Sequence, residues 1–217
     1  MSRRAWRRDP ETAFFPLPES ERELALHAHL TTTRAMLSDL QRKKLTRYFR
    51  VYDVDDNGRI GPHDFERVVE NVRILHGLSD DSPAHRQLHE GFMRRWRALR
   101  DSADDDADGG VDLEEWLEYW EGVLEEDDRY SREVASVTAR LFEIFDTDED
   151  GVLGPREFCD FYGIFGLSAS LARDVFQELD ADDDGFMSRE ELLEVARQFY
   201  RSDDPEARGN LLYGPYD

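Results

Sequence analysis

The sequence predicts an all-helical protein made of four helix–loop–helix units that associate in two pairs. Three features indicate this fold class. Four acidic loops of twelve residues repeat one pattern of oxygen-bearing side chains, each loop has an apolar residue at its eighth position, and each is followed by apolar residues at helical spacing. The loops cover residues 53–64, 104–115, 146–157 and 180–191, named here loops one to four. A solvated acidic segment explains one such loop but not four repeats of both patterns.

Loop two, DDDADGGVDLEE, shows the pattern most completely. Counting from Asp104, carboxylates stand at positions 1, 3, 5, 9 and 12, and Gly109 stands at position 6, where a sharp turn requires a positive φ. This is the pattern of an EF-hand loop, in which Ca²⁺ takes about six to eight oxygens and position 7 supplies its backbone carbonyl. A count from Asp105 would place Ala107 at position 3 and Trp116 at position 12, so only the Asp104 register fits.

The same register identifies the expected metal ligands of all four loops. Loop one offers Asp53, Asp55, Asn57, the carbonyl of Arg59, and Asp64. Loop two offers Asp104, Asp106, Asp108, the carbonyl of Gly110, Asp112 and Glu115. Loop three offers Asp146, Asp148, Asp150, the carbonyl of Val152, and Glu157. Loop four offers Asp180, Asp182, Asp184, the carbonyl of Phe186, Ser188 and Glu191.

Loop one differs from the others at two of these positions. It ends in the shorter Asp64 where the others end in glutamate, and it has Gly61 at position 9. Bidentate closure by an aspartate requires the following helix to move inward, and Mg²⁺ prefers six ligands at shorter distances. We therefore expect three or four Ca²⁺ ions per chain, with loop one a weak Ca²⁺ site or a mixed Mg²⁺ and Ca²⁺ site.

The helices of the first two units have clear sequence signals. Ser38 and Gln41 form a capping-box pair that starts the first entering helix, and the exit helix of loop one is expected over about residues 62–75. After a linker, Ser82 and Pro83 start the second entering helix. That helix carries an apolar stripe of Leu88, Phe92, Trp96 and Leu99, with Arg94, Arg95, Arg97 and Arg100 expected outside it. Since Trp96 is in phase with the stripe, we expect it in the core rather than on a target-binding face.

The second half follows the same plan. An acidic break between the halves is expected at residues 121–128, and Val134 to Phe145 predict the third entering helix. Ser168 or Ser170 is expected to cap the fourth. Residues at position 8 of paired loops should meet across a short antiparallel bridge. The expected partners are Ile60 opposite Val111 and Leu153 opposite Met187.

These signals divide the chain into four parts. Residues 1–35 form a basic N-terminal extension, expected to be disordered or partly helical. The first pair of units covers residues 36–128 and the second pair residues 129–200. Residues 201–217 form a C-terminal tail that is expected to pack on the body, with Leu211, Leu212 and Tyr213 as an apolar plug.

Composition excludes several classes of protein. The net charge of −22 argues against nucleic acid or an anionic membrane as partner, because either needs a broad basic surface. No apolar run is long enough to span a membrane, and Asp9, Pro10 and Glu11 stand where an export signal after the arginines at the start would need apolar residues. The single cysteine, Cys159, is compatible with a reducing compartment. We therefore expect a cytoplasmic protein, most simply a monomer, whose protein partner, if any, is unknown.

Beyond the loops, longer stretches resemble one known group of proteins. These stretches are MLSDLQRKKLTRYFRVYDVDDNG, ADDDADGGVDLEEWLEYW and SDDPEARGNLLYGP. They resemble the sarcoplasmic calcium-binding protein, calexcitin and calerythrin group over about residues 36–217. The resemblance implies a compact all-helical protein in which two pairs pack together, acting as a calcium buffer or signal protein. Members commonly have one degenerate loop, whereas all four loops here keep their ligand positions.

Other functions receive less support from the residues. Related coelenterazine-binding photoproteins need a histidine in the C-terminal half, and every histidine here lies before residue 90. His63, His85 and His89 have no third ligand in register for a transition metal, and no nucleophile motif or phosphate loop occurs. We therefore expect no enzyme. A Ca²⁺ buffer with an aromatic core is favoured, and a Ca²⁺ sensor that exposes a surface to a protein partner remains the alternative, because a buffer has no use for a basic arm.

Overall fold

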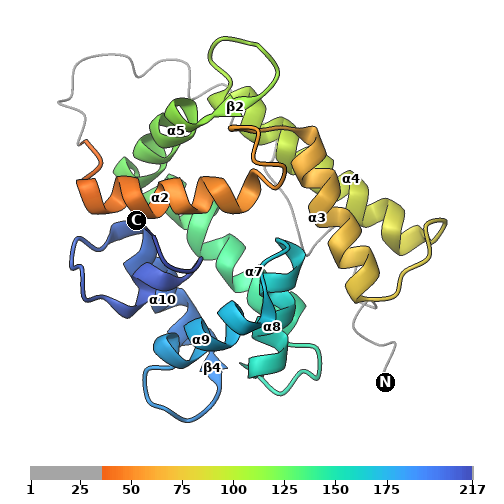
Figure 1. Ribbon diagram of the computed structural model, residues 1–217, viewed down its shortest axis with the longest axis vertical. Coiled ribbons are helices and arrows are strands. Elements are labelled where there is room, and N and C mark those ends of the chain that lie inside the picture. The colour runs from red at the N-terminus through yellow and green to blue at the C-terminus, as the bar shows by residue number, and fades with distance from the viewer. Residues whose placement is uncertain (1–35, 217) are drawn as a thin grey trace.

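The computed structural model describes residues 36–216, so the predicted extension at 1–35 lies outside the described residues. The first half contains α2 (Asp39–Tyr52), β1 (Arg59–Ile60), α3 (Pro62–Leu75), α4 (Pro83–Ala103), β2 (Val111–Asp112) and α5 (Leu113–Glu125). The second half contains α6 (Asp127–Tyr130), the π-helical η3 (Ser131–Ala135), α7 (Ser136–Phe145), β3 (Val152–Leu153), α8 (Pro155–Ile164), α9 (Ala169–Leu179), β4 (Met187–Ser188) and α10 (Arg189–Arg201). A short 3₁₀ helix, η4 (Arg208–Leu211), lies in the tail. Figure 1 shows the arrangement.

Serine caps start three of the entering helices. Ser38 accepts a hydrogen bond from the Gln41 amide in a complete capping box, and Ser82 and Ser168 each accept from the amide three residues on. Each bond satisfies one of the amides that a helix N-terminus leaves without an internal partner. The predicted caps are confirmed, with Ser168 rather than Ser170 capping α9.

Two short antiparallel bridges join the loops in pairs. Ile60 pairs with Val111 between β1 and β2, and Leu153 pairs with Met187 between β3 and β4. All four side chains are buried. The predicted register is confirmed, because these apolar side chains can leave water only by facing one another under the paired loops.

One expectation about the helices was wrong. The acidic break at 121–128 is largely helical, since α5 continues to Glu125 and α6 begins at Asp127. Burial of Val123 explains this, because the apolar face of α5 extends one turn past Trp120. Arg95 lies outside the apolar stripe of α4, as expected, but it is less exposed than Arg94 and Arg97. Its guanidinium is partly buried and bonds to Glu133 of η3 at 2.9 Å.

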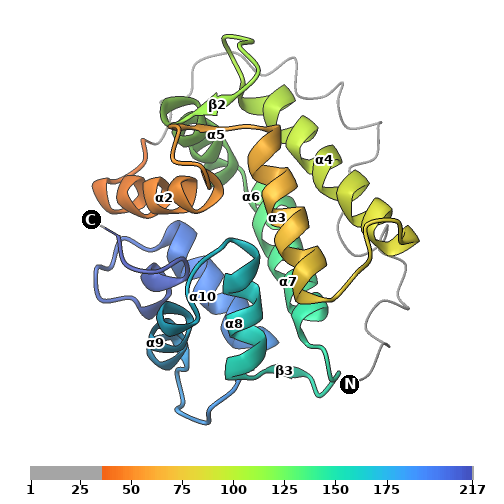
Figure 2. The same cartoon turned by 45° about the vertical axis from the view of Figure 1, so that its right-hand side comes forward.

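One aromatic core runs through both halves. Helix α2 lies between α5 and α10 (Figure 1), and α3 of the first half lies against α8 of the second (Figure 2). The Tyr48 ring of α2 stacks on Tyr213 of the tail with centroids 4.1 Å apart, and it meets Trp116 of α5 edge-on at 5.2 Å. Trp120 stacks on Tyr200 of α10 at 4.8 Å. Because such rings bury large areas in one geometry, they hold the halves in a fixed relative position.

A polar face of α2 holds the C-terminal end of the chain. It consists of Ser38, Gln41, Lys44 and Arg47, which recur at every third residue and are called here the α2 stripe. Ser38 bonds to the Asp203 carboxylate and Gln41 donates to the Tyr200 carbonyl. Arg47 donates to the Tyr213 carbonyl at 2.8 Å. The stripe therefore binds the end of α10 and the tail from the N-cap of α2 to Arg47.

Lys44 is the most buried member of this stripe. Its side chain has no exposed surface, and its ammonium donates to the carbonyls of Gln198 and Ser202 and to Oδ1 of Asn210, at 2.8–3.0 Å. Two of these acceptors belong to the last turn of α10 and its cap, where the helix dipole favours a cation. The Gln198 carbonyl also accepts from the Ser202 amide, so Lys44 is its second donor. Burial lowers the pKa of Lys44 to about 8, and the nearby Asp203 carboxylate opposes this shift.

We predict that Lys44→Met lowers the free energy of unfolding by about 2 kcal/mol, because it removes the ammonium donor from the Ser202 carbonyl and from the buried Oδ1 of Asn210. Lys43→Met changes the exposed neighbouring lysine and should have little effect. Urea unfolding followed by circular dichroism measures both. Equal stability of the two variants would show that Lys44 does not hold the tail.

The difference in stability between wild type and Lys44→Met should depend on pH in a defined direction. Between about pH 8 and the ordinary lysine value of 10.5, the unfolded chain binds more protons at Lys44 than the folded chain does. The contribution of Lys44 to stability therefore rises with pH across this window. The Lys44→Met variant lacks this titrating group. The difference in free energy of unfolding between wild type and variant should therefore widen from pH 8 to 10.

Candidate metal centres

The four loops follow the same backbone path. Position 6 is a glycine in the left-handed region in each, with φ between 84° and 91°, as expected from the sequence. Position 4 is also left-handed, at Asp56, Ala107, Glu149 and Asp183 with φ of 55–61°. Sequence reasoning missed this second constraint. Asp56 and Asp183 carried a weak signal, since aspartate tolerates this region, but Ala107 and Glu149 carried none.

The side chain at position 1 organises the first half of each loop. In loop one, Asp53 accepts hydrogen bonds from the amides of Asn57 at 3.0 Å and Gly58 at 2.9 Å. The corresponding bonds of loops two and three join Asp104 and Asp146 to positions 5 and 6, and Asp180 of loop four accepts from Gly185. These bonds curl the loop around the carboxylate.

Positions 3 and 5 form further local turns. Asp55, Asp106 and Asp182 at position 3 accept from the amide of position 5. Asn57, Asp108, Asp150 and Asp184 at position 5 accept from the amide of position 7, at 2.8–3.1 Å. Each such turn directs its carboxylate or amide group toward the inside of the loop.

The residue at position 12 ties the end of loops one, two and three to the beginning of the same loop. Glu115 accepts from the amides of Asp105 and Asp112, both at 2.9 Å, and Glu157 accepts from Thr147 and Gly154 in the same way. Glu191 accepts from the Ser188 amide. Because position 9 is the N-cap and position 12 the third residue of the exit helix, one carboxylate serves both the helix start and the loop. Asp112 and Ser188 also cap with their own side chains, which accept from the amides of Glu115 and Glu191.

Asp64 reaches the same amides in loop one despite its shorter side chain. It accepts from Val54 at 3.0 Å and from Gly61 at 2.7 Å, and it is 1% exposed. Its carboxylate lies close to those of Asp53 and Asp55. Loop one therefore closes through the same contacts as loops two and three, which end in glutamate.

Each loop brings several carboxylates to one point. In loops one, three and four, oxygens of positions 1, 3 and 12 lie within 4.8 Å of one another; the groups are Asp53, Asp55 and Asp64, then Asp146, Asp148 and Glu157, then Asp180, Asp182 and Glu191. In loop two the group consists of Asp104, Asp106 and Asp108. The position 7 residues Arg59, Gly110, Val152 and Phe186 lie in the bridging strands or directly before them.

Such clusters of like charge are costly without a cation. Burial raises the pKa of the Asp64 carboxyl, the Gly61 and Val54 amides oppose this, and the charges of Asp55 and Asp53 add to it. In loop four, Oδ1 of Asp180 is buried and accepts no hydrogen bond from the described chain. A buried carboxylate oxygen without a donor is unfavourable, and a hard divalent cation would satisfy it. An all-oxygen donor set with several carboxylates suits Ca²⁺ or Mg²⁺ rather than zinc.

Comparison with known families agrees with this geometry. The family described as EF hand matches residues 46–69 and 172–196, and the family described as EF-hand domain pair matches residues 136–163. The first two segments contain loops one and four, and the third contains loop three.

Several characterised proteins are similar over most of the chain. Calerythrin of Saccharopolyspora erythraea is 25% identical over 170 residues, which cover 77% of this chain and 94% of calerythrin. A sarcoplasmic calcium-binding protein of Scylla paramamosain is 26% identical, with coverage of 80% and 93%. Calexcitin-1 of Caenorhabditis elegans is 25% identical, with coverage of 81% and 86%.

A solved structure supports the fold independently. The coelenterazine-binding protein of Renilla muelleri, in its calcium-loaded apo form, superposes with a TM-score of 0.61 over 82% of this chain and 99% of that chain. At 22% identity this likeness shows the fold alone. Three segments of the chain thus match EF-hand family models, and most of the chain is similar to the sarcoplasmic calcium-binding proteins, calexcitin and calerythrin.

Proposed function

We propose that this protein binds three or four Ca²⁺ ions through its four loops and acts as a calcium buffer or compact signal modulator. The observation that carries the proposal is that every loop brings three carboxylates to one point, and that one buried oxygen among them, in loop four, lacks a hydrogen-bond partner in the described chain. The proposed ligands are those assigned from the sequence register. Ca²⁺ would supply the positive charge that these carboxylates need, and its release and uptake would be the activity.

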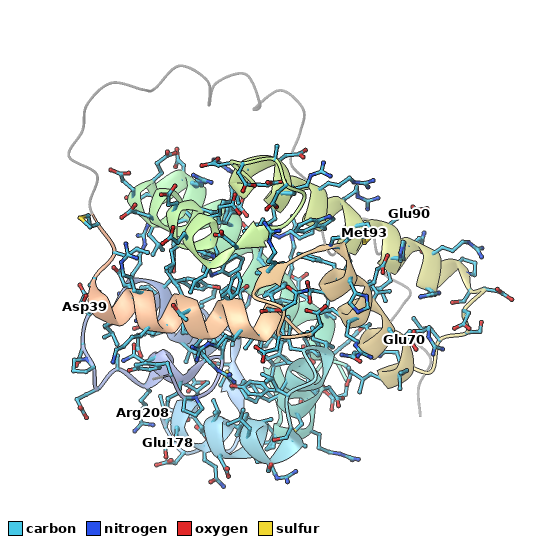
Figure 3. All side chains as sticks on the ribbon, turned by 45° about the horizontal axis from the view of Figure 1, so that its top comes forward. Asp39, Glu70, Glu90, Met93, Glu178 and Arg208 are labelled. Carbon is cyan, nitrogen blue, oxygen red and sulfur yellow. The ribbon has the colours of Figure 1, made fainter. Side chains whose placement is uncertain are left out.

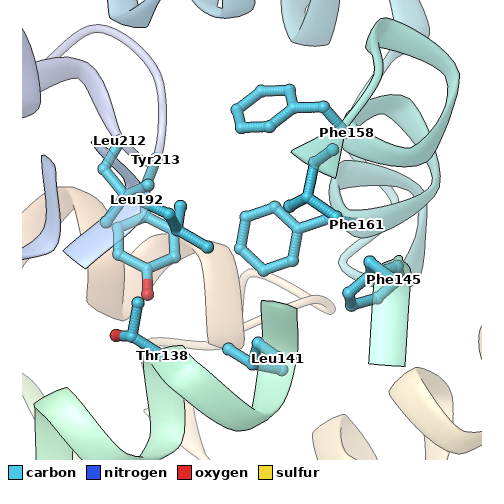
Figure 4. A pocket seen from close by; sticks show the side chains of 9 residues that line it. Thr138, Leu141, Phe145, Phe158, Phe161, Leu192, Leu212 and Tyr213 are labelled. Atoms are coloured by element: carbon cyan, nitrogen blue, oxygen red, sulfur yellow. The ribbon is translucent and has the colours of Figure 1, made fainter. Parts of the chain in front are cut away.

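The closed second half favours a buffer over a sensor. An apolar pocket between α7, α8 and α10 is lined by residues such as Leu141, Phe161 and Leu192, and by Leu212 and Tyr213 of the tail (Figure 4). Its free volume of about 20 Å³ matches about one water molecule. A sensor that opens on binding Ca²⁺ exposes a flexible groove there, often rich in methionine. Here aromatic rings and the tail fill the space instead.

Hydrogen bonds hold the tail in this position. The Tyr162 hydroxyl donates to the Leu212 carbonyl at 2.8 Å, and Arg208 donates to the Asp180 carbonyl at 2.8 Å, at the start of loop four. Figure 3 labels Arg208 of the tail and Glu178 of α9 on the same side of the view. Together with the α2 stripe, these bonds attach the tail to both halves. We propose that the pairs at 36–128 and 129–200 work as one body closed by residues 201–217.

Further properties follow from the same proposal. We propose a monomer without catalytic activity, because the carboxylates of the loops are committed to metal. In the part of the chain that the structure describes, no helix is long and apolar enough to cross a membrane. Burial raises the pKa of the Cys159 thiol, which makes it a poor nucleophile, and a free thiol suits a reducing compartment such as the cytoplasm.

Calorimetric titration of the metal-stripped protein tests the binding proposal. We expect three or four Ca²⁺ per chain, with dissociation constants on the order of 10⁻⁸ to 10⁻⁶ M for loops two to four. Glu115→Gln, Glu157→Gln and Glu191→Gln should each remove one ion, because each weakens the closing ligand of one loop. The matched controls Glu114→Gln and Glu190→Gln change exposed neighbours and should leave the count unchanged. An unchanged count in all three closing variants would show that the register is wrong.

A second titration in millimolar Mg²⁺ tests loop one. We expect Mg²⁺ to compete there, because the compact closure by Asp64 suits a smaller ion. Asp64→Glu should strengthen Ca²⁺ binding at loop one several-fold and weaken the effect of Mg²⁺, while loops two to four keep their affinities. If loop one proves the tightest Ca²⁺ site and Mg²⁺ does not affect it, the assignment of this loop fails.

An apolar dye distinguishes the buffer from the sensor. In the full-length protein we expect little difference in dye fluorescence between the Ca²⁺-loaded and metal-free forms. Deletion of residues 205–217, or the milder Tyr213→Ala, should raise dye binding in the Ca²⁺ form because it uncovers the pocket, whereas Pro215→Ala at an exposed position should not. A sharp Ca²⁺-dependent rise in the full-length protein would instead establish the sensor.

A further inference from the structure

The side chain of Arg59 reaches from loop one into loop two. Arg59 stands at position 7 of its own loop, where the sequence assigns a role only to its carbonyl. Its guanidinium forms an ion pair with the carboxylate of Asp108, the position 5 ligand of loop two. A Cβ built on Gly110 would lie 3.4 Å from Arg59 Nε, so the same side chain also covers position 7 of loop two.

The bridge between the loops explains this placement. Arg59 pairs with Asp112 in the β1–β2 register, so position 7 of loop one lies opposite position 9 of loop two. From there the arginine side chain extends along loop two over Gly110 to Asp108. Three ligand positions of loop two are therefore next to one fixed cation.

Loop two is also the loop with the largest number of negative charges at ligand positions. It has five carboxylates there, Asp104, Asp106, Asp108, Asp112 and Glu115, whereas loop one has three and loops three and four have four each. Five carboxylates around one divalent ion leave three negative charges without balance. A guanidinium at Asp108 reduces that excess both with and without the ion.

The second pair provides a comparison within the same chain. Val152 occupies position 7 of loop three and pairs with Ser188, which is position 9 of loop four. This is the same register as that of Arg59 and Asp112. With valine in place of arginine, loop four has no cation from its partner loop at this point, although its position 5 residue, Asp184, is also a carboxylate.

We propose that Arg59 is a built-in counter-cation that sets the Ca²⁺ affinity of loop two from the neighbouring loop. Its charge repels the ion and competes with it for Asp108, so it lowers the affinity of a site whose five carboxylates would otherwise bind very tightly. Arg59 thereby neutralises part of the negative charge of loop two before Ca²⁺ binds. The weaker binding favours release of Ca²⁺ from this loop when the free Ca²⁺ concentration falls. This inference rests on the proposed function, because it concerns the regulation of one of the same four sites.

The test isolates loop two in the full-length chain. Asp64→Asn, Glu157→Gln and Glu191→Gln together silence the closing ligands of the other loops, and circular dichroism checks that the chain stays helical. In this background, Arg59→Gln should bind Ca²⁺ roughly three- to tenfold more tightly at about 0.1 M salt, with a smaller gain at about 1 M salt because the effect is electrostatic. Arg59→Lys, which keeps the charge, should stay near the parent. Arg97→Gln on α4 removes an equal charge from an exposed position and should change the affinity little.

The reciprocal change tests the same idea in the second pair. Val152→Arg, measured with loops one to three silenced by Asp64→Asn, Glu115→Gln and Glu157→Gln, should weaken Ca²⁺ binding to loop four. If loop two binds Ca²⁺ equally well with arginine and glutamine at position 59, the inference is wrong while the proposed function stands. If loop two binds no Ca²⁺ in the parent background, the proposed function fails at that loop and the inference fails with it.

Discussion

The contact between α2 and the C-terminal end of the chain is the constraint on which the closed structure depends. A fully buried ammonium, that of Lys44, lies among the last carbonyls of α10 and the side chain of Asn210. A charge in such a place is stable only while all its acceptors stay around it. Since α2 leads into loop one and α10 leaves loop four, this contact joins the first and last units, and the Tyr48 and Tyr213 rings pack beside it.

Within each loop, hydrogen bonds from backbone amides hold the carboxylates close together before any ion is present. The carboxylate at position 1 accepts from the amides ahead of it, and in loops one to three the carboxylate at position 12 accepts from amides near both ends of the loop. The same position 12 residue belongs to the capping box of the exit helix. Metal binding and the start of that helix therefore share one side chain, so a change at position 12 should affect both.

The pairing of loops has an electrostatic consequence as well as a structural one. Antiparallel bridges bury the position 8 residues, and they also place position 7 of one loop beside position 9 of the other. In the first pair this brings Arg59 to the carboxylates of loop two, whereas in the second pair the same position is Val152. Two pairs with the same backbone thus differ in the charge that one loop presents to its partner.

The sequence by itself determined the local features of this protein. The loop registers, the glycines at position 6, the serine caps and the partners across the bridges all depend on spacing along the chain, where the short-range rules of turns, caps and periodicity apply. The features that depend on contacts between distant segments were decided only by the tertiary structure. It extended α5 through the acidic stretch because Val123 is buried, turned Arg95 inward to Glu133, and placed Lys44 and Arg59 beside oxygens from distant segments. A charged side chain has the same local pattern whether it is solvated or paired, so its partner becomes known only when the helices and loops are packed together.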